Sequence, residues 1–311
     1  MAYVFKKIGE TYMLDTKTDI KDELPSNVYK VSIKKEGVFF DPLKIVKDDL
    51  IRVPNSVTDD VLNFIDKFTS EETKQRYINS KFVHKAGILL EGPAGSGKSG
   101  TLNLIIDDII KKDAIVFFDA DPEVVAAVLP AVREQNPNKL ICVVYEEFDE
   151  WLTSSQATIN SFLDGQLSVN NMIVLATTNY ISKIPSRIKN RPSRFQIVKH
   201  VGVPDEAFRR AWFTKKLTDI NHADKIEGFV GQSEGMVVDQ MKDLIVSHIA
   251  LEIPLIDAVK KLQTMADDAA GIDDYVENEG LSALRAKSIK NLFSLGKGFS
   301  IKPVNPFDEE R

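Results

Sequence analysis

The chain has 311 residues, 43% hydrophobic and 28% charged, which is ordinary for a protein with a sizeable core and more than one domain. Its formal net charge of -6 argues against a protein that mainly coats nucleic acid. The single cysteine, Cys142, excludes a disulfide scaffold or a cysteine zinc site within one chain. The start of the chain lacks the apolar core of a signal peptide, and no apolar run approaches the roughly 18–20 residues of a membrane span. We therefore expect a cytoplasmic protein with no membrane span.

Residues 1–50 predict a small, partly β module. Segment 28–33 alternates between apolar and polar residues, and 38–40 does so more loosely. The sequence Lys34-Lys35-Glu36-Gly37 between them is typical of a hairpin turn. Residues 51–85 are expected to be mainly helical and to begin the next domain.

From residue 86 onward, apolar runs alternate with helical segments. The runs are 86–91, 114–118, 140–145, 172–176 and 196–198. Within each run apolar and polar residues do not alternate, which suits strands of a parallel sheet that helices cover on both faces. The helices are expected over about 98–112, 122–133 and 155–164. The pattern predicts an α/β domain over residues 51–203.

From about residue 204 the pattern is helical only. Helices are expected over 205–218, 235–250 and 254–266, which predicts a small α-helical lid domain over 204–266. The remaining residues, 267–311, begin as an acidic linker and end in a candidate basic amphipathic helix from Leu281 to Leu295.

The most informative segment follows the first apolar run. Gly92, Gly97, Lys98 and Ser99 match the pattern G-x-x-x-x-G-K-[ST] between a strand and a helix. Glycines lack Cβ, so the backbone can curl with its N–H groups around phosphate oxygens, and the helix N-terminus adds the positive end of its dipole. Lys98 can reach the β- and γ-phosphates, and the Ser99 hydroxyl can ligate Mg²⁺. The loop expected to bind a nucleoside triphosphate with Mg²⁺ consists of Gly92, Pro93, Ala94, Gly95, Ser96, Gly97, Lys98, Ser99 and Gly100.

Further motifs follow in the order found in AAA+ ATPases. The strand 140–145 runs into Glu146-Glu147-Phe148-Asp149, at the place of the Walker B element. The next strand ends in Thr177-Thr178-Asn179, which looks like sensor 1, and Arg191-Pro192-Ser193-Arg194-Phe195 is close to the arginine-finger segment RPGRF. The chain thus resembles the AAA branch of this family over roughly residues 51–265. The resemblance implies a P-loop NTPase fold with a parallel sheet and flanking helices.

Within that branch, two segments look like the type that translocates the Rieske iron–sulfur protein in mitochondria. They are Phe162-Leu163-Asp164-Gly165 and Ala176-Thr177-Thr178-Asn179-Tyr180. The acidic pair Glu146-Glu147, where Asp-Glu is usual, is also similar. We expect no membrane anchor of that type in this chain, so the cargo and location of that type are not carried over.

The resemblance implies a role for each polar residue after the strands. Glu146 would take the place of the Walker B aspartate and bind Mg²⁺ together with Ser99. Glu147 would polarise the attacking water as general base, and Asn179 would hold that water or the γ-phosphate. Without the glycine loop, an acidic run after a strand is more simply explained as a solvated loop.

The same resemblance assigns arginine fingers. Arg191 and Arg194 would reach the γ-phosphate bound by a neighbouring subunit, with Arg187 as a third candidate. A basic surface loop is the alternative explanation. A finger that acts in trans requires a ring or filament, and we expect a homo-hexamer with active sites at the subunit interfaces.

The partner on which such an ATPase would act is harder to predict. Residues 117–122 contain no aromatic-hydrophobic-glycine pore loop, which weakens the case for a threading unfoldase and favours an ATPase that remodels or disassembles a protein partner. The alternative is a nucleic-acid-associated motor or a clamp-loader-like ATPase, which only the basic tail helix favours. A third alternative is an assembly scaffold that hydrolyses ATP slowly.

Overall fold

The computed structural model describes residues 4–15, 23–35, 37–44, 51–53, 56–164, 169–191, 193–262 and 264. The chain divides into two units, Met1–Lys242 and Asp243–Arg311, which are described separately. The predicted tail helix, Leu281 to Leu295, lies outside the described residues.

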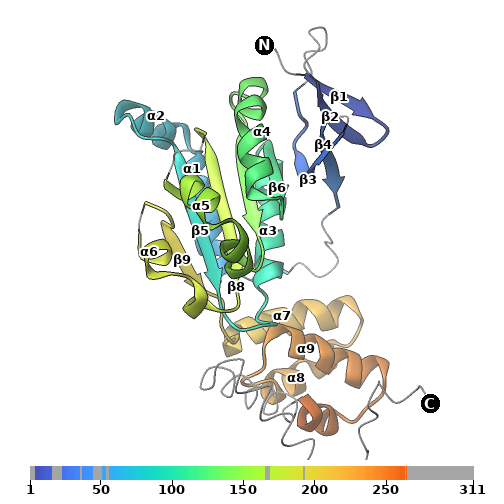
Figure 1. Ribbon diagram of the computed structural model, residues 1–311. Coiled ribbons are helices and arrows are strands. Elements are labelled where there is room, and N and C mark those ends of the chain that lie inside the picture. The colour runs from blue at the N-terminus through green and yellow to red at the C-terminus, as the bar shows by residue number, and fades with distance from the viewer. Residues whose placement is uncertain are drawn as a thin grey trace, which may run out of the picture. The chain divides into compact units, whose positions relative to one another are not determined.

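The first unit is built on one nine-stranded sheet (Figure 1). In spatial order the strands are β1 (Val4–Ile8), β2 (Thr11–Asp15), β4 (Gly37–Leu43), β3 (Asn27–Lys34), β6 (Ala114–Phe118), β7 (Leu140–Tyr145), β8 (Met172–Thr178), β5 (Lys85–Glu91) and β9 (Ile197–His200). All pairs from β3 to β9 are parallel, whereas β1, β2, β4 and β3 pair antiparallel. Every residue of β7 and β8 is buried, as their non-alternating sequences predict. The mostly parallel sheet with flanking helices confirms the predicted P-loop NTPase fold class.

Helices cover both faces of the parallel part of the sheet. On one face, α1 (Val57–Thr69) and α3 (Lys98–Lys111) pack in one apolar cluster with side chains that include Ile88 of β5. On the other face, α4 (Pro122–Gln135) and α5 (Phe148–Asp164) pack in a second cluster that includes Leu89, the next residue of β5. Successive side chains of a strand point to opposite faces, so one continuous apolar strand supplies both clusters. The short helix α2 (Glu71–Asn79) follows α1 and buries none of its residues.

The described N-terminal strands extend the central sheet. β3 and β4 form the predicted hairpin, and β3 also pairs in parallel with β6. Phe40 of β4 packs against Tyr29 and against Phe117 of β6, with ring centroids 6.3 and 6.0 Å apart. Side chains of β1, β3 and β4 thus share one apolar cluster with side chains of the α/β region. A domain boundary after residue 50 stays a prediction.

The helices after β9 follow the predicted pattern with some differences. α7 (Glu206–Asp219) and α8 (Ile226–Gln232) lie in the first unit, and α9 (Val238–Ile245) runs from the first unit into the second. A π-helix, Val246–Ala250, continues from α9, and residues 255–262 are helical. No helix in the described ranges has the length and apolar character needed to cross a bilayer.

One helix of the α/β region begins earlier than the sequence predicts. α5 starts at Phe148 rather than near residue 155, because two helical segments join across a kink at Ser155, where φ is −134° and ψ is 31°. The earlier start brings the acidic run after β7 directly to the N-terminus of a helix.

Candidate active site

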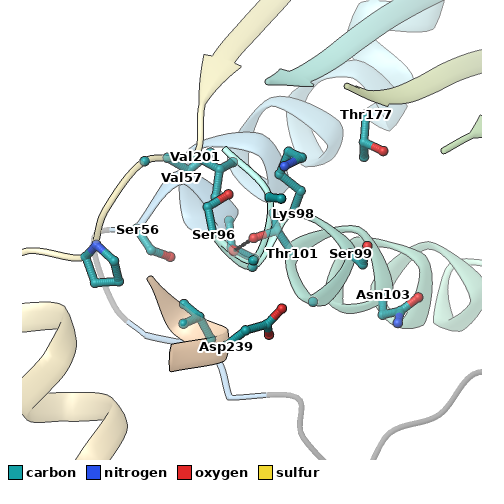
Figure 2. Close-up of a pocket in the computed structure, with 18 of the residues that line it drawn as sticks. Ser56, Val57, Ser96, Lys98, Ser99, Thr101, Asn103, Thr177, Val201 and Asp239 are labelled. Carbon is teal, nitrogen blue, oxygen red and sulfur yellow. Dashed lines mark hydrogen bonds between the residues drawn. The ribbon is translucent and has the colours of Figure 1, made fainter. Parts of the chain in front are cut away.

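A cavity of about 1540 Å³ lies where the parallel strands end. Its walls come from the glycine loop and α3, from the residues that follow β6, β7, β8 and β9, and from α7 and the start of α9. Figure 2 shows the side of the cavity that the glycine loop forms. The carboxyl ends of parallel strands meet at one edge of a sheet, which is why motifs far apart in the sequence converge there.

The glycine loop has the backbone that only glycines adopt without strain. Gly92, Gly95 and Gly97 have φ angles of 153°, 73° and 99°. A Cβ on Gly92 would lie 2.1 Å from the carbonyl oxygen of Val201, so a larger residue there requires a backbone shift. A Cβ on Gly100, in contrast, would meet nothing within 4 Å. Three of the four glycines therefore have a conformational reason to be glycine.

Lys98 is the first residue of α3 and is 7% exposed. Its ammonium group donates hydrogen bonds of 2.8 Å to the carbonyl oxygens of Gly92 and Pro93. Burial lowers the pKa of Lys98, while the nearby carboxylates of Glu91, Asp239 and Glu146 raise it. The loop backbone thus surrounds the Lys98 ammonium group. This positive charge fits a site for an anionic ligand.

Ser99 connects the loop to the end of β7. Its hydroxyl donates a hydrogen bond of 2.5 Å to Oε1 of Glu146. Hydroxyl and carboxylate oxygens commonly bind Mg²⁺ in proteins. The Ser99 Oγ and the Glu146 Oε1 are in direct contact. The Oγ of Ser96, which is buried, has no hydrogen-bond partner in the described structure, so the loop also contains an unused polar atom. Ser99 and Glu146 therefore fit a magnesium site.

The turn between β7 and α5 presents two glutamates to the cavity. Glu146 is half-buried and Glu147 is exposed. Glu147 has a φ of 47°, in the left-handed region that non-glycine residues rarely adopt. Its carbonyl oxygen accepts a hydrogen bond of 2.8 Å from the N–H of Glu150, so the turn leads directly into α5.

Asp119, which the sequence motifs do not include, lies beside this turn. Its Oδ1 accepts a hydrogen bond of 2.8 Å from the backbone N–H of Glu146. Burial raises the pKa of Asp119 to about 6; the charges of Glu146 and Glu147 add to this rise, and hydrogen bonds from the Glu146 N–H and from Trp151 oppose it. An aspartate directly after the predicted strand 114–118 was the signal that could have revealed it.

The end of β8 lines the same cavity with Thr177, Thr178 and Asn179. The Thr178 hydroxyl donates to Oδ1 of Asp149 at 2.7 Å and accepts from the N–H of Tyr180 at 3.0 Å. The backbone on either side of Asn179 is thereby fixed to the first turn of α5. The predicted sensor residue therefore lies in the same cavity as Lys98, Ser99, Glu146 and Glu147.

The predicted arginine fingers are not among the residues that line this cavity. Arg194 is 5% exposed, and its guanidinium group donates to both carboxylate oxygens of Asp164, at 2.7 and 2.6 Å, and to Asn160 at 2.7 Å. Arg194 holds the pKa of Asp164 below its ordinary value. Arg191 also contacts Asp164, at 3.4 Å, but its side chain is 57% exposed. Arg187 is exposed and donates to Gln156 at 2.8 Å.

Comparison with known proteins adds one finding to this geometry. No curated protein matches the chain. A family model does match, over residues 88–203, and its family is described as the ATPase family associated with various cellular activities (AAA). The matched segment runs from β5 to the residues after β9 and contains the glycine loop, Glu146, Glu147 and Asn179. The narrower likeness to the Rieske-protein translocase type stays a prediction. Residues 88–203 therefore carry a domain similar to the AAA family of ATPases.

Proposed function

We propose that the chain is an ATPase of the AAA+ type that hydrolyses ATP in the presence of Mg²⁺. One observation carries the proposal: Lys98 and Ser99 of a strained glycine loop line the same cavity as Glu146 and Glu147 of the adjacent strand end. The match of residues 88–203 to an ATPase family supports it. We keep the predicted division into an ATPase domain, 51–203, and a lid, 204–266, as part of the proposal.

The loop and α3 bind the triphosphate. Backbone N–H groups of the loop and the N-terminus of α3 attract phosphate oxygens, and the Lys98 ammonium group supplies the nearest full positive charge. Ser99 and Glu146 would hold Mg²⁺, which neutralises and orients phosphate oxygens when it is bound. Glu146 is one methylene longer than the usual aspartate, and it reaches the Ser99 hydroxyl directly.

Glu147 acts as the general base. It accepts a proton from a water molecule as that water attacks the γ-phosphorus; the bond from γ-phosphorus to the bridging oxygen breaks, and ADP and phosphate are formed. Asn179, which follows the Thr178 that is hydrogen-bonded to Asp149, orients the water or the γ-phosphate. General base catalysis contributes about 10²–10⁴-fold to such reactions, which sets the loss expected when Glu147 is removed.

The complete site includes a second copy of the chain. Arg191 is our candidate for the arginine finger, because it is exposed and Arg194 is already bound by Asp164 and Asn160. Arg194 holds the segment that carries Arg191. We propose a homo-oligomeric ring, most simply a hexamer, that remodels or disassembles a protein partner. The nucleic-acid alternative depends on a tail helix that lies outside the described residues.

The test is steady-state phosphate release with and without Mg²⁺. We expect turnover from the unaltered protein, no nucleotide binding by Lys98→Ala, and tight binding with a turnover at least about 10²-fold lower for Glu147→Gln. Lys111→Ala is the matched control, because Lys111 lies at the far end of α3 and is 71% exposed. Equal turnover in the Glu147→Gln and unaltered proteins would contradict the assignment of the base.

A further inference from the structure

The connector between α2 and β5 exposes apolar side chains on a fixed backbone. Phe82, Ile78 and Val83 are 71%, 64% and 40% exposed. The N–H of Phe82 donates to the carbonyl oxygen of Tyr77 at 3.1 Å, and the N–H of Lys81 donates to that of Ile78 at 3.0 Å. With Lys81 in the left-handed region at a φ of 57°, these two hydrogen bonds form a Schellman motif that ends α2. The backbone of Phe82 is thus held in place although its side chain is exposed.

The chain that follows the connector is also fixed. His84 is 5% exposed, and its ring centroid lies 4.0 Å from that of Phe68 and 4.8 Å from that of Tyr77. The N–H of His84 donates to Oδ1 of Asn170 at 3.0 Å. Phe82 therefore lies between two anchored parts of the chain. An exposed aromatic residue on such a backbone has little conformational freedom to lose on binding, and aromatic residues are enriched in protein–protein interfaces.

The first residues of β5 place this connector beside the segment that carries Arg191. Nζ of Lys85 donates to the carbonyl oxygen of Ser193 at 2.8 Å. A Cβ on Gly87 would lie 1.9 Å from the carbonyl oxygen of Arg194, so the two backbones are in close contact. Figure 1 shows α2 and β9 at the end of the sheet opposite the N-terminal strands. The exposed connector and Arg191 thus belong to one side of the first unit.

This side of the first unit is positively charged. Segments 73–85 and 184–195 contain four Lys or Arg residues each and no Asp or Glu. Neighbouring carboxylates balance part of this charge, namely those of Glu71, Glu72 and Asp164. Arg187 and Lys189 donate to neutral oxygens, and Lys81 is exposed. The surface around Phe82 is therefore both apolar and cationic.

The cavity that contains the proposed triphosphate site has the opposite charge. The lysines that line it are Lys98 and Lys242. The acidic residues that line it are Asp119, Glu146, Glu147, Glu150, Asp205 and Asp239. A triphosphate bound with Mg²⁺ is itself negative and would add to this charge. Two different surfaces of opposite charge on the same chain favour a head-to-tail contact between copies, which can close into a ring.

We infer that Ile78, Phe82 and Val83 form the apolar part of an interface in which this side of one copy binds the cavity side of a second copy. Phe82 is the anchor of the interface, and Arg191 belongs to the same surface. The inference rests on the proposed function, because it names the surface through which two copies would share a site. It differs from the arginine-finger assignment, since Phe82 contributes to assembly and has no part in the hydrolysis.

The experiment measures assembly by analytical ultracentrifugation over a range of protein concentrations, with a slowly hydrolysed ATP analogue and Mg²⁺. Phe82→Ser removes the anchor, and we expect the concentration at which half of the chains are assembled to rise about 10-fold or more. Binding of a fluorescent ATP analogue should be unchanged, because Phe82 does not line the cavity. Ile33→Ser is the matched control: Ile33 is 60% exposed on β3, among the N-terminal strands, and its replacement should leave assembly unchanged.

A second variant tests the charge of the same surface. Lys81→Glu should also weaken assembly, and the difference from the unaltered protein should shrink as the salt concentration rises, because exposed charges are screened. Thermal unfolding of both variants checks that they are folded. Since both side chains are exposed, we expect no loss of stability.

A cross-link locates the partner surface. The only cysteine, Cys142, is buried, so the thiol introduced by Phe82→Cys can be labelled selectively with a benzophenone maleimide. After illumination we expect a product with the mass of two chains, in which position 82 of one copy is joined to a segment that lines the cavity of the other. A product joined to the connector of the other copy would contradict the head-to-tail contact.

The possible outcomes separate this inference from the ATPase assignment. Turnover by a protein that stays monomeric at every concentration would overturn the interface and leave the assignment of the glycine loop intact. Assembly that depends on Phe82, in a protein without turnover, would do the reverse. Equal assembly of Phe82→Ser and the unaltered protein would overturn the interface alone. So would a Phe82→Ser variant that assembles normally but no longer binds DNA or RNA, which would identify a nucleic-acid surface instead.

Discussion

The glycine loop and the arginine segment 184–195 are both predicted from short motifs, but their residues differ in how they are placed in the structure. In the loop, adjacent residues work together: the glycines shape the backbone that surrounds Lys98. In the arginine segment, Arg194 is buried in an ion pair and Arg191, three positions earlier, is exposed. A motif that forms a site within one chain fixes the place of each residue. If the arginine segment serves a neighbouring chain, as we propose, its motif alone does not show which arginine reaches that chain.

The largest effect should come from the exposed arginine. We expect Arg191→Ala to lower turnover about 10³-fold or more, because a finger supplied in trans contributes 10³–10⁵-fold in related phosphoryl transfers. Nucleotide affinity should change little. The measurement is phosphate release from Arg191→Ala mixed with Glu147→Gln at several ratios. Recovery of turnover in the mixtures supports a shared site; wild-type turnover in Arg191→Ala alone refutes the finger.

The next effect tests the loop itself. Gly92→Ala places a Cβ 2.1 Å from the Val201 carbonyl oxygen at a φ of 153°, so we expect loss of nucleotide binding and about 1–3 kcal/mol of destabilisation. Gly100→Ala serves as the stability control: it meets nothing within 4 Å and replaces a helical glycine, so stability should rise by about 0.5–1 kcal/mol. Denaturant unfolding gives both values. Equal stability for the two variants would contradict the described loop.

Replacement of the buried Arg194 should destabilise the protein to a similar extent, without a direct effect on hydrolysis. Arg194→Ala leaves Asp164 and Asn160 without their main partner, and we expect about 3 kcal/mol of destabilisation, near the lower end for a broken buried ion pair because Asp164 is 32% exposed. Arg191→Ala should cost less than about 1 kcal/mol, as is usual for an exposed pair. Thermal unfolding of the two variants checks this contrast. Equal losses of stability in the two variants would contradict the described difference between a buried Arg194 and an exposed Arg191.

The smallest effect lies outside both regions. Burial lowers the pKa of His84, whose Nε2 lies 3.0 Å from the carbonyl oxygen of Phe68. A lowered folded-state pKa means that the unfolded chain binds more protons below the ordinary value of 6.5, so stability falls as the pH falls through 6.5. His84→Gln should reduce this dependence between pH 7 and pH 5. The free energy of unfolding is measured by urea titration at several pH values. If it depends on pH equally in His84→Gln and in the unaltered protein, the prediction is wrong.

Much of the fold could be predicted because its signals are local. The apolar runs at 114–118 and 140–145 became β6 and β7 with the predicted bounds. The pairing of β3 with β6 could not be predicted, since nothing in segment 28–33 specifies which strand its free edge will meet. The start of α5 was missed because Glu146-Glu147-Phe148-Asp149 matches the Walker B element, which does not predict where the next helix begins, and because the helix passes a kink at Ser155.

In the candidate site, too, only the residues with a local sequence signal could be predicted. The glycine loop was predictable residue by residue, since one motif prescribes its conformation. Asp119 gives only the weak signal of an aspartate directly after a predicted strand, because its contact depends on a neighbouring strand and on a backbone N–H, which leave no motif in the sequence. Arg194 matched its motif as well as Arg191 did, and only the contacts of Asp164 separate the two.

The most direct measurement is calorimetric titration of Glu147→Gln with ATP and Mg²⁺. We expect close to one nucleotide bound per chain, and no measurable binding when Lys98→Ala is added to the same protein. Absence of binding in Glu147→Gln, or undiminished binding in the double variant, would contradict the assignment of the glycine loop as the triphosphate site.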